Sequence, residues 1–341
     1  REAFKLEDFA RSPKEIKNVM STIITSRGCP YECSFCASQK TGYRFRSADN
    51  VLKEIRQVKE RYGVNNFYLI DDTINVNSPR LLELSKKLKD EHIQWRCNGR
   101  FDLFSEELLV AMKEAGCIHI SIGVESGDNA VLERMHKRLN TDIIKEKAKL
   151  IHKVGIGLTV NFMFGFPFET AENIDNTIKL IKAIEPYVSD FQRAGILIPF
   201  PGTTLYEEFK QGSKYDKWWL RPNDFMSEVR ESDYRPLYKK FLFDDLGLLD
   251  KGTFFDYSED VKKKIREGMR VIDQIVMRRK AKTLNFTKFK VMNDLIYGGM
   301  NAFVFTSKLL YNINPKVERK IIHPMYYRLR RSKYYLKNKT Y

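Results

Sequence analysis

The sequence lacks several features that would assign it to common protein classes. Its 341 residues contain no run of 18 or more apolar residues, so we expect no transmembrane helix. The first ten residues are mixed and charged, unlike a secretory signal. The chain has neither a G-x-x-x-x-G-K-[ST] loop nor an H-E-x-x-H motif. With 43% hydrophobic and 30% charged residues, the composition is nevertheless that of a globular protein.

Cysteine is scarce and unevenly placed. Of five cysteines, Cys29, Cys33 and Cys36 lie within eight residues, whereas Cys97 and Cys117 stand alone. An odd count with one tight cluster is not typical of a disulfide framework in a secreted protein. We therefore predict a metal site in a reducing compartment, the cytoplasm.

Acidic residues are scarce toward the C-terminus. Residues 262–341 hold 21 Lys and Arg against 4 Asp and Glu, so the last quarter carries the whole net charge of +16. This asymmetry predicts either a solvated basic tail or a surface for an anionic partner. Basic and tyrosine residues alternate over 324–341, after an apolar stretch at 301–311 that is typical of an interfacial helix. We favour peripheral binding of this segment to an anionic membrane surface over binding to RNA. The third possibility is a tail that only packs on the domain.

Strand and helix patterns alternate along the first 200 residues. The pattern predicts strands at 21–26, 66–70, 93–97, 118–124, 156–164 and 191–198, and helices at 47–62, 79–91, 105–115, 141–154 and 171–184. Such repeats favour an α/β fold with a parallel sheet, here a partial (β/α)6 TIM-like barrel or a curved open sheet. A helical pattern follows at 257–284.

These patterns divide the chain into four parts. We expect a leader or remnant of an upstream linker at 1–20, a barrel core at 21–212, an aromatic-rich cap loop and helix at 213–284, and a mainly helical, basic C-terminal region at 285–341. In such a barrel, the loops at the carboxyl ends of the strands form the active face.

The clustered cysteines follow the first predicted strand with the spacing C-x3-C-x2-C. A structural zinc site normally has four protein ligands, and an iron–sulfur cluster usually has four cysteines. The loop supplies three, and the nearest histidine is His92. The spacing therefore indicates a metal centre with one open position, or a zinc site completed by Cys97, Cys117 or a histidine from elsewhere in the chain.

This loop resembles that of the radical S-adenosylmethionine (SAM) enzymes, which place an aromatic residue, here Phe35, before the last cysteine. The resemblance covers about residues 20–210. It implies a [4Fe–4S] cluster held by Cys29, Cys33 and Cys36, with SAM chelating the fourth iron. Reductive cleavage of SAM would then give a 5′-deoxyadenosyl radical that abstracts hydrogen from the substrate.

The resemblance also implies contacts to SAM at the ends of the later strands. Asp71 and Asp72 would bind the amine, and Arg100 would bind the carboxylate unless it pairs with Asp102. The predicted ribose and adenine contacts are Ser121, Glu125, Gly165, Ile196 and Leu197, of which the last two are equally well explained as core residues. The FMFGFPFE stretch matches the family's fifth strand, although many relatives have glycine where Phe168 stands.

Several longer sequence motifs, among them SRGCP, FYLIDDT and PFPGTTLYE, resemble those of the cobalamin-dependent branch of this family. That branch implies a parent protein with an upstream cobalamin-binding domain, methyl transfer, and an electron donor such as flavodoxin or ferredoxin. A radical SAM cyclase, isomerase or oxidoreductase is the alternative within the class. A metal-stapled nucleic-acid-binding module is the alternative outside it. The aromatic-rich segment after residue 212 suits a small-molecule or lipid-like substrate.

Overall fold

The computed structural model describes residues 20–211, 213, 215–217, 220 and 254–283. The chain divides into two compact units, Arg1–Gln211 and Gly212–Tyr341. The six-stranded sheet described below lies in the first unit.

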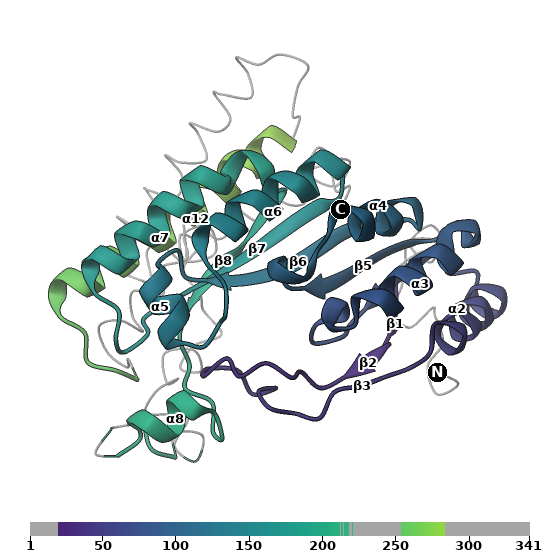
Figure 1. The fold of residues 1–341 in the computed structure, drawn as a ribbon. Coiled ribbons are helices and arrows are strands. Elements are labelled where there is room, and N and C mark those ends of the chain that lie inside the picture. Colours follow the sequence, from purple (N-terminus) through teal and green to yellow (C-terminus); the bar gives the residue numbers. More distant parts are fainter. Residues whose placement is uncertain (1–19, 212, 214, 218–219, 221–253, 284–341) are drawn as a thin grey trace, which may run out of the picture. The chain divides into compact units, whose positions relative to one another are not determined.

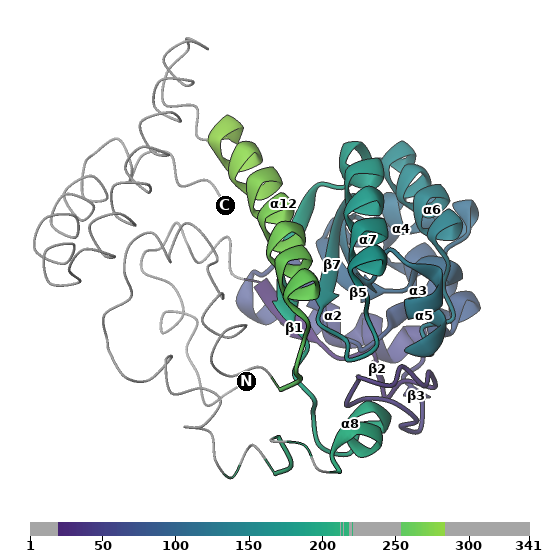
Figure 2. The same ribbon diagram turned by 90° about the vertical axis from the view of Figure 1, so that its left-hand side faces the viewer.

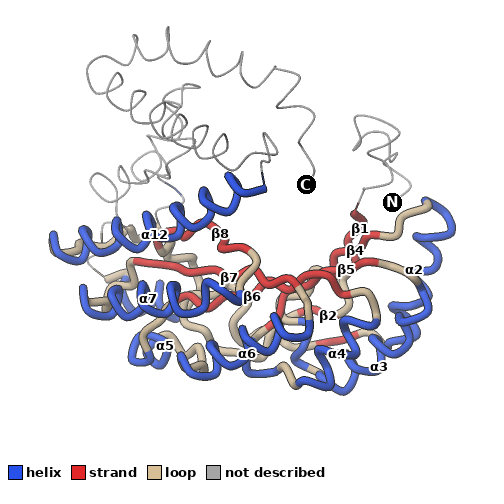
Figure 3. Tube along the Cα trace, turned by 90° about the horizontal axis from the view of Figure 1, so that it is seen from above, coloured by secondary structure: helices blue, strands red, loops and turns tan. Residues whose placement is uncertain are grey.

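The first unit is built on a parallel, curved sheet (Figures 1 and 3). Its strands are paired in the order β1-β4-β5-β6-β7-β8, with β1 and β8 at the two edges. They are β1 Met20–Ile23, β4 Asn66–Leu69, β5 Gln94–Gly99, β6 Cys117–Glu125, β7 Gly157–Phe164 and β8 Asp190–Ile196. This arrangement confirms the predicted partial barrel or curved open sheet.

Helices connect successive strands and cover the convex side of the arc (Figure 3). They are α2 Ala48–Tyr62, α3 Ser78–Leu88, α4 Glu106–Glu114, α5 Asn129–Arg134, α6 Thr141–Val154 and α7 Ala171–Ile184. Short 3-10 turns are found at Ile74–Val76, Lys89–Glu91, Phe101–Leu103 and Glu185–Tyr187. Capping residues account for several boundaries: α6 begins after Asn140, whose side chain accepts from two backbone amides, and ends at Gly155 in the left-handed conformation.

The two faces of the sheet differ in chemistry. Along β7, the side chains that are buried are Leu158, Val160, Phe162 and Phe164, while those between them are only half-buried. Because side chains alternate across a strand, the apolar set faces the helices and the intervening set, which includes Thr159 and Asn161, faces the concave side. The concave side is therefore the polar one, and the core lies between the sheet and the helices.

A short antiparallel ribbon lies at the carboxyl end of the sheet. It pairs β2 Ser26–Arg27 with β3 Arg44–Phe45. Helix α8 Thr204–Phe209 lies at the same end, as both views show (Figures 1 and 2). The sequence pattern did not predict this ribbon, α8 or the short α5. The predicted strand 21–26 is divided into β1 and β2, because Thr25 between them is held by Asp71 instead of a neighbouring strand.

The second unit is described over one long helix, α12 Glu259–Thr283. Its buried residues recur at helical spacing, as predicted, and include Val261, Ile265, Met269, Ile272 and Ile275. No helix among the described residues is long and apolar enough to cross a membrane. Most of the predicted cap loop, the region 285–341 and the leader 1–19 lie outside the described residues, so the predictions for them stay predictions.

Candidate iron–sulfur and SAM site

The three clustered cysteines lie on the loop between β2 and β3. The loop begins at Gly28, whose φ of +81° is in the left-handed region that favours glycine. A Cβ atom there would lie 2.4 Å from the carbonyl oxygen of Gly42, on the returning side of the loop. The Cys29 amide donates to Thr41 Oγ1 at 2.9 Å. Glycine at position 28 thus allows both sides of the loop to approach closely at its neck.

The loop is also tied to distant parts of the first unit. The amide of Ser34 donates to the carbonyl of Met135 at 2.9 Å, and the Ser34 carbonyl accepts from the Leu205 amide at 2.8 Å. The side chain of Gln39 donates to the Gly202 carbonyl at 3.3 Å. The loop is therefore fixed by residues that follow β6 and β8 as well as by its own ribbon.

The three thiols are free and differ in their exposure. Cys33 is buried, whereas Cys29 and Cys36 are half-buried. Burial raises the pKa of Cys36, and the neighbouring Cys33 and Cys29 raise it further. Within the described part of the chain, no three His, Cys, Asp or Glu side chains converge closely enough to hold one metal ion. The loop thus carries three free thiols, which is the ligand set that the family resemblance implies for a [4Fe–4S] cluster.

Cys97 and Cys117, the candidate additional ligands of a zinc site, are not part of this loop. They lie on the neighbouring strands β5 and β6 and are 1% and 0% exposed. Burial, followed by a hydrogen bond with Cys117, raises the pKa of Cys97 well above its usual value. Both cysteines are core residues, so the structure does not support a zinc site that they complete.

Arg100 lies against the cysteine loop instead of opening toward a ligand. Its guanidinium pairs with Asp102 at 3.1 Å and stacks over the ring of Tyr31 at 3.8 Å from the centroid. One nitrogen is 3.9 Å from Cys33 Sγ, and another donates to the Lys137 carbonyl at 2.6 Å. Burial lowers the pKa of Arg100, but Asp102, with smaller contributions from Cys33 and Tyr31, raises it, and the net shift is upward. Of the two predicted roles for Arg100, the structure has the pairing with Asp102. The Arg100 guanidinium also lies beside Cys33, which is a candidate cluster ligand.

Asp71 and Asp72 follow β4 but have different surroundings. Asp71 is 1% exposed, and its carboxylate accepts from Thr25 N at 2.6 Å, Thr25 Oγ1 at 2.5 Å and Ser26 Oγ at 2.7 Å. These bonds tie the chain after β1 to the end of β4, which is a structural role instead of the predicted contact with an amine. Asp72 is exposed and accepts from Ser38 Oγ, on the cysteine loop, at 3.2 Å. Asp72 is therefore the carboxylate of the pair that is open to a ligand.

Glu125, at the end of β6, is nearly buried. It pairs with Lys137 at 3.2 Å, and its φ of +70° is unusual for a residue with a side chain. Lys137 in turn lies 5.6 Å above the ring of Phe35. Ser121 lies on the half-buried, concave side of β6, in register with Asn98 and Thr159. Both residues therefore lie on β6, and the carboxylate of Glu125 is already paired with Lys137.

The loop after β7 contains a carboxyl group that was not predicted from the sequence. Glu169 accepts from the amides of Gly165 at 2.7 Å and Phe166 at 3.0 Å. Its other oxygen, Oε1, is buried without a hydrogen-bond partner among the described residues. Burial raises the pKa of Glu169 to about 7, although the two amide bonds lower it. Glu169 thereby holds Gly165 in place at a φ of +83°. Glu169 is the last residue of the GFPFE sequence, so its position four residues after Gly165 was the feature of the sequence from which this contact could have been predicted.

The remaining predicted contacts differ in their accessibility. Phe35 packs edge-to-face on Phe166 at 5.7 Å between centroids, beneath the cysteine loop. Ile196 is half-buried at the end of β8, while the next residue, Leu197, is 1% exposed. Leu197 is therefore a core residue and not a surface for adenine.

Parts of the chain resemble known proteins. Residues 23–181 match the family model of the radical SAM superfamily. An uncharacterized methyltransferase from Pyrococcus horikoshii is 34% identical over 190 residues, which cover 54% of this chain and 41% of that protein. The anaerobic magnesium-protoporphyrin IX monomethyl ester cyclase of Rubrivivax gelatinosus is 28% identical over 214 residues, covering 61% and 38% of the two chains.

A similar fold is found in the cobalamin-dependent S-adenosylmethionine radical enzyme OxsB, solved with aqua-cobalamin and SAM bound. Its TM-score is 0.55 at 18% identity, and the match covers 90% of this chain and 49% of that one. The chain thus spans less than half the length of these three proteins.

A parallel partial barrel with three free thiols on the loop after its first strand is the arrangement that the resemblance implies for enzymes that combine an iron–sulfur cluster with SAM. Residues 23–181 of this chain match the radical SAM superfamily, and the chain resembles the cobalamin-dependent branch of that superfamily, as its motifs predicted. Members of the superfamily use a [4Fe–4S] cluster and SAM, act on small-molecule substrates and need a reductant.

Proposed function

We propose that Cys29, Cys33 and Cys36 hold the [4Fe–4S] cluster and that the chain cleaves SAM with it. The observation that supports this most directly is the placement of three free thiols on one loop, braced at its neck by Gly28 and at Cys33 by Arg100. When bound, such a cluster supplies the electron that breaks a C–S bond of SAM.

The chain's own residues orient and shield this centre. Arg100 places a positive charge 3.9 Å from the sulfur of Cys33 and braces this part of the loop. Asp72 offers an exposed carboxylate next to the loop and is our candidate for binding the SAM amine. Asp71 holds the strand ends together beneath it, and Glu169 shapes the turn at Gly165 that we assign to adenine.

The experiment that tests this assignment is anaerobic reconstitution with iron and sulfide. Replacing Cys29, Cys33 or Cys36 by Ala should each abolish cluster binding and the formation of 5′-deoxyadenosine. The matched Cys97→Ala and Cys117→Ala variants should keep four irons per chain, because these thiols lie in the core of the sheet. Loss of the cluster in a Cys97 variant would show that the three-cysteine assignment is incorrect.

For the parent protein, we propose methyl transfer through cobalamin, supported by the relative from Pyrococcus horikoshii and by the branch-specific motifs. Ring formation is the second candidate, because the cyclase of Rubrivivax gelatinosus matches 61% of this chain. Product analysis separates them, since methyl transfer yields S-adenosylhomocysteine and ring formation alone does not. We further propose a flavodoxin or ferredoxin as the reductant and a cytoplasmic location.

The metal-stapled nucleic-acid module is not supported, because the fold and the family are those of an enzyme. The basic segment 324–341, which prompted that alternative and the proposed anionic membrane surface, lies outside the described residues. A vesicle sedimentation assay still tests the membrane proposal. The intact chain should pellet with anionic vesicles at low salt, and a chain lacking 324–341 should pellet much less.

A further inference from the structure

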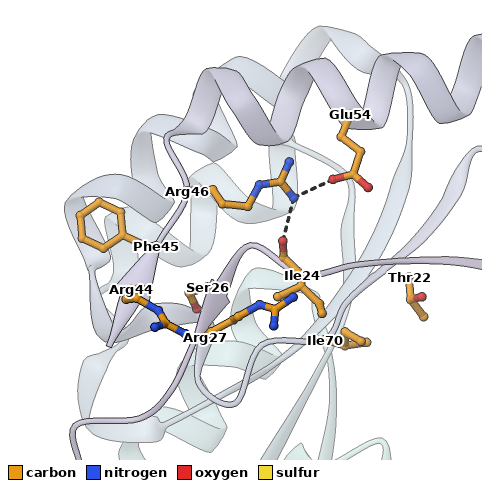
Figure 4. Close-up of a pocket in the computed structure, with 9 residues that line it drawn as sticks. All are labelled: Thr22, Ile24, Ser26, Arg27, Arg44, Phe45, Arg46, Glu54 and Ile70. Carbon is orange, nitrogen blue, oxygen red and sulfur yellow. Dashed lines mark hydrogen bonds and ion pairs between the residues drawn. The ribbon is translucent and has the colours of Figure 1, made fainter. Parts of the chain in front are cut away.

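A pocket of about 400 Å³ lies beside β1, which is an edge strand of the sheet as described, and Figure 4 shows the residues that line it. Part of its wall is apolar and exposed: Ile24 is 37%, Phe45 51% and Ile70 37% exposed. The other lining residues are polar or charged, namely Thr22, Ser26, Arg27, Arg44, Arg46 and Glu54. This volume falls within the range of small-molecule sites, and the lining is more polar than is usual for them.

The three arginines of this pocket are not equivalent. Arg46 is fully engaged, because it pairs with Glu54 at 2.6 Å and donates to the carbonyl of Ile24 at 2.8 Å (Figure 4). Arg27 and Arg44 are exposed, and neither guanidinium makes an ion pair or hydrogen bond within the described part of the chain. Two positive charges in this pocket are therefore not neutralised by the residues that surround them.

The backbone forces these two charges together. Arg27 and Arg44 are direct partners in the β2–β3 ribbon, so their side chains lie on the same face. Like charges directly opposite each other destabilise an antiparallel pair. An anion bound between the two guanidinium groups would reverse the sign of this interaction, and arginine is well suited to carboxylate and phosphate oxygens.

Two residues of the pocket are close in sequence to residues of the proposed reaction centre. Arg27 precedes Cys29 by two residues, so their Cα atoms lie within about 7 Å of each other. Ile70 immediately precedes Asp71 and Asp72, at the end of β4. A molecule held in this pocket would therefore lie next to the cysteine loop and the carboxylate that we assign to SAM.

We propose that Arg27 and Arg44 bind the acidic group, a carboxylate or a phosphate, of the organic substrate, with its apolar part against Ile24, Phe45 and Ile70. This inference rests on the proposed function, and it names the substrate class as an amphipathic acid. A concave pocket of this volume favours a small molecule over a docked electron-donor protein, whose interface would bury a broader area.

The test uses short acids as probes on the full, reconstituted chain. Calorimetric titration with hexyl phosphate and hexanoate should show binding, with hexylamine much weaker than either. Inorganic phosphate should bind less tightly than hexyl phosphate if the apolar wall contributes, and the two acids show whether a phosphate or a carboxylate is preferred. A double variant, Arg27→Gln with Arg44→Gln, should weaken binding of the acids at least tenfold.

The matched control is Arg96→Gln. Arg96 is another exposed arginine of the first unit without an ion pair in the described part of the chain, but it lies on β5 outside this pocket. Its loss should leave acid binding unchanged. Ile70→Ser should weaken hexyl phosphate more than inorganic phosphate. Thermal melting of each variant separates a loss of binding from a loss of folding, and the single Arg44→Gln variant replaces the double one if the latter unfolds.

Failure of this inference can be told apart from failure of the proposed function. Iron content and SAM cleavage without substrate report on the cluster site, whereas acid binding reports on the pocket. Absence of acid binding, or equal binding in the double variant and the parent, would overturn the inference while leaving SAM cleavage in place. If the double variant lost cleavage supported by reduced flavodoxin but kept cleavage supported by dithionite, the arginines would instead serve a protein donor.

Discussion

Replacing Gly28 by Ala tests whether the neck of the cysteine loop is as tight as the structure indicates. The added Cβ would lie 2.4 Å from the Gly42 carbonyl oxygen, and the φ of +81° would have to be retained by a residue that disfavours it. The left-handed conformation costs a non-glycine residue about 1–2 kcal/mol. Forcing extra volume against packed atoms costs typically another 1–3 kcal/mol. We therefore expect Gly28→Ala to destabilise the loop by roughly 2–5 kcal/mol.

Two other glycines provide matched controls for the two energetic costs, that of the left-handed conformation and that of the close contact. Gly63 has a φ of +64° with nothing within 4 Å of an added Cβ, so Gly63→Ala should cost only the conformational term, about 1–2 kcal/mol. Gly42 has neither a positive φ nor a nearby atom, so Gly42→Ala should change stability by about 0.5 kcal/mol or less.

The measurement is urea unfolding followed by circular dichroism, together with iron bound per chain after reconstitution. Gly28→Ala should lose both stability and iron, whereas Gly63→Ala should lose a little stability and keep its iron. Equal effects of Gly28→Ala and Gly63→Ala would show that the close approach of the two sides of the loop contributes nothing.

Two further predictions concern single carboxyl groups. Asp72→Asn should weaken SAM binding roughly tenfold to hundredfold, because a charge-assisted hydrogen bond is worth about 1.5–3 kcal/mol. Asp71→Asn should instead lower the melting temperature, because the Asp71 carboxylate holds the chain after β1. Unchanged affinity of Asp72→Asn for SAM in equilibrium dialysis would show that the amine binds elsewhere. The pKa of Glu169 is raised from 4.5 to about 7, so the folded state binds this proton more tightly than the unfolded state does. As the pH rises from 4.5 to 7, the stabilisation from the bound proton is lost, and the free energy of unfolding falls by about 3 kcal/mol in all. Unfolding free energies between pH 5 and pH 8 should fall less steeply in Glu169→Gln than in the parent, and parallel curves would contradict the assignment.

The repeating architecture could be predicted from the sequence because each repeat carries its own signals. The predicted helices 141–154 and 171–184 coincide with α6 and α7, where capping residues stand at the ends of a clear apolar period. The β2–β3 ribbon could not be predicted, because two-residue strands have no period to detect.

The candidate site was only partly predictable for a different reason. The cysteine spacing is local, so the ligand loop could be identified from the sequence. The contact between Arg100 and Cys33 joins residues 67 positions apart, and that between Glu125 and Lys137 depends on the bend after β6. The unequal roles of Asp71 and Asp72 also depend on burial, which adjacent and chemically identical residues do not reveal.

The hydrogen bond between Ser34 and Leu205 has a consequence for the order of events during synthesis. The two residues are separated by 171 positions, 205 minus 34. At a translation rate of about 5–20 residues per second, the segment that closes over the cysteine loop leaves the ribosome roughly 10–35 s after the cysteines themselves. During that interval the three thiols belong to a nascent chain whose loop is not yet anchored. Stable loading with iron is therefore expected only after the segment around Leu205 has emerged, and premature oxidation of these thiols is a hazard specific to the growing chain.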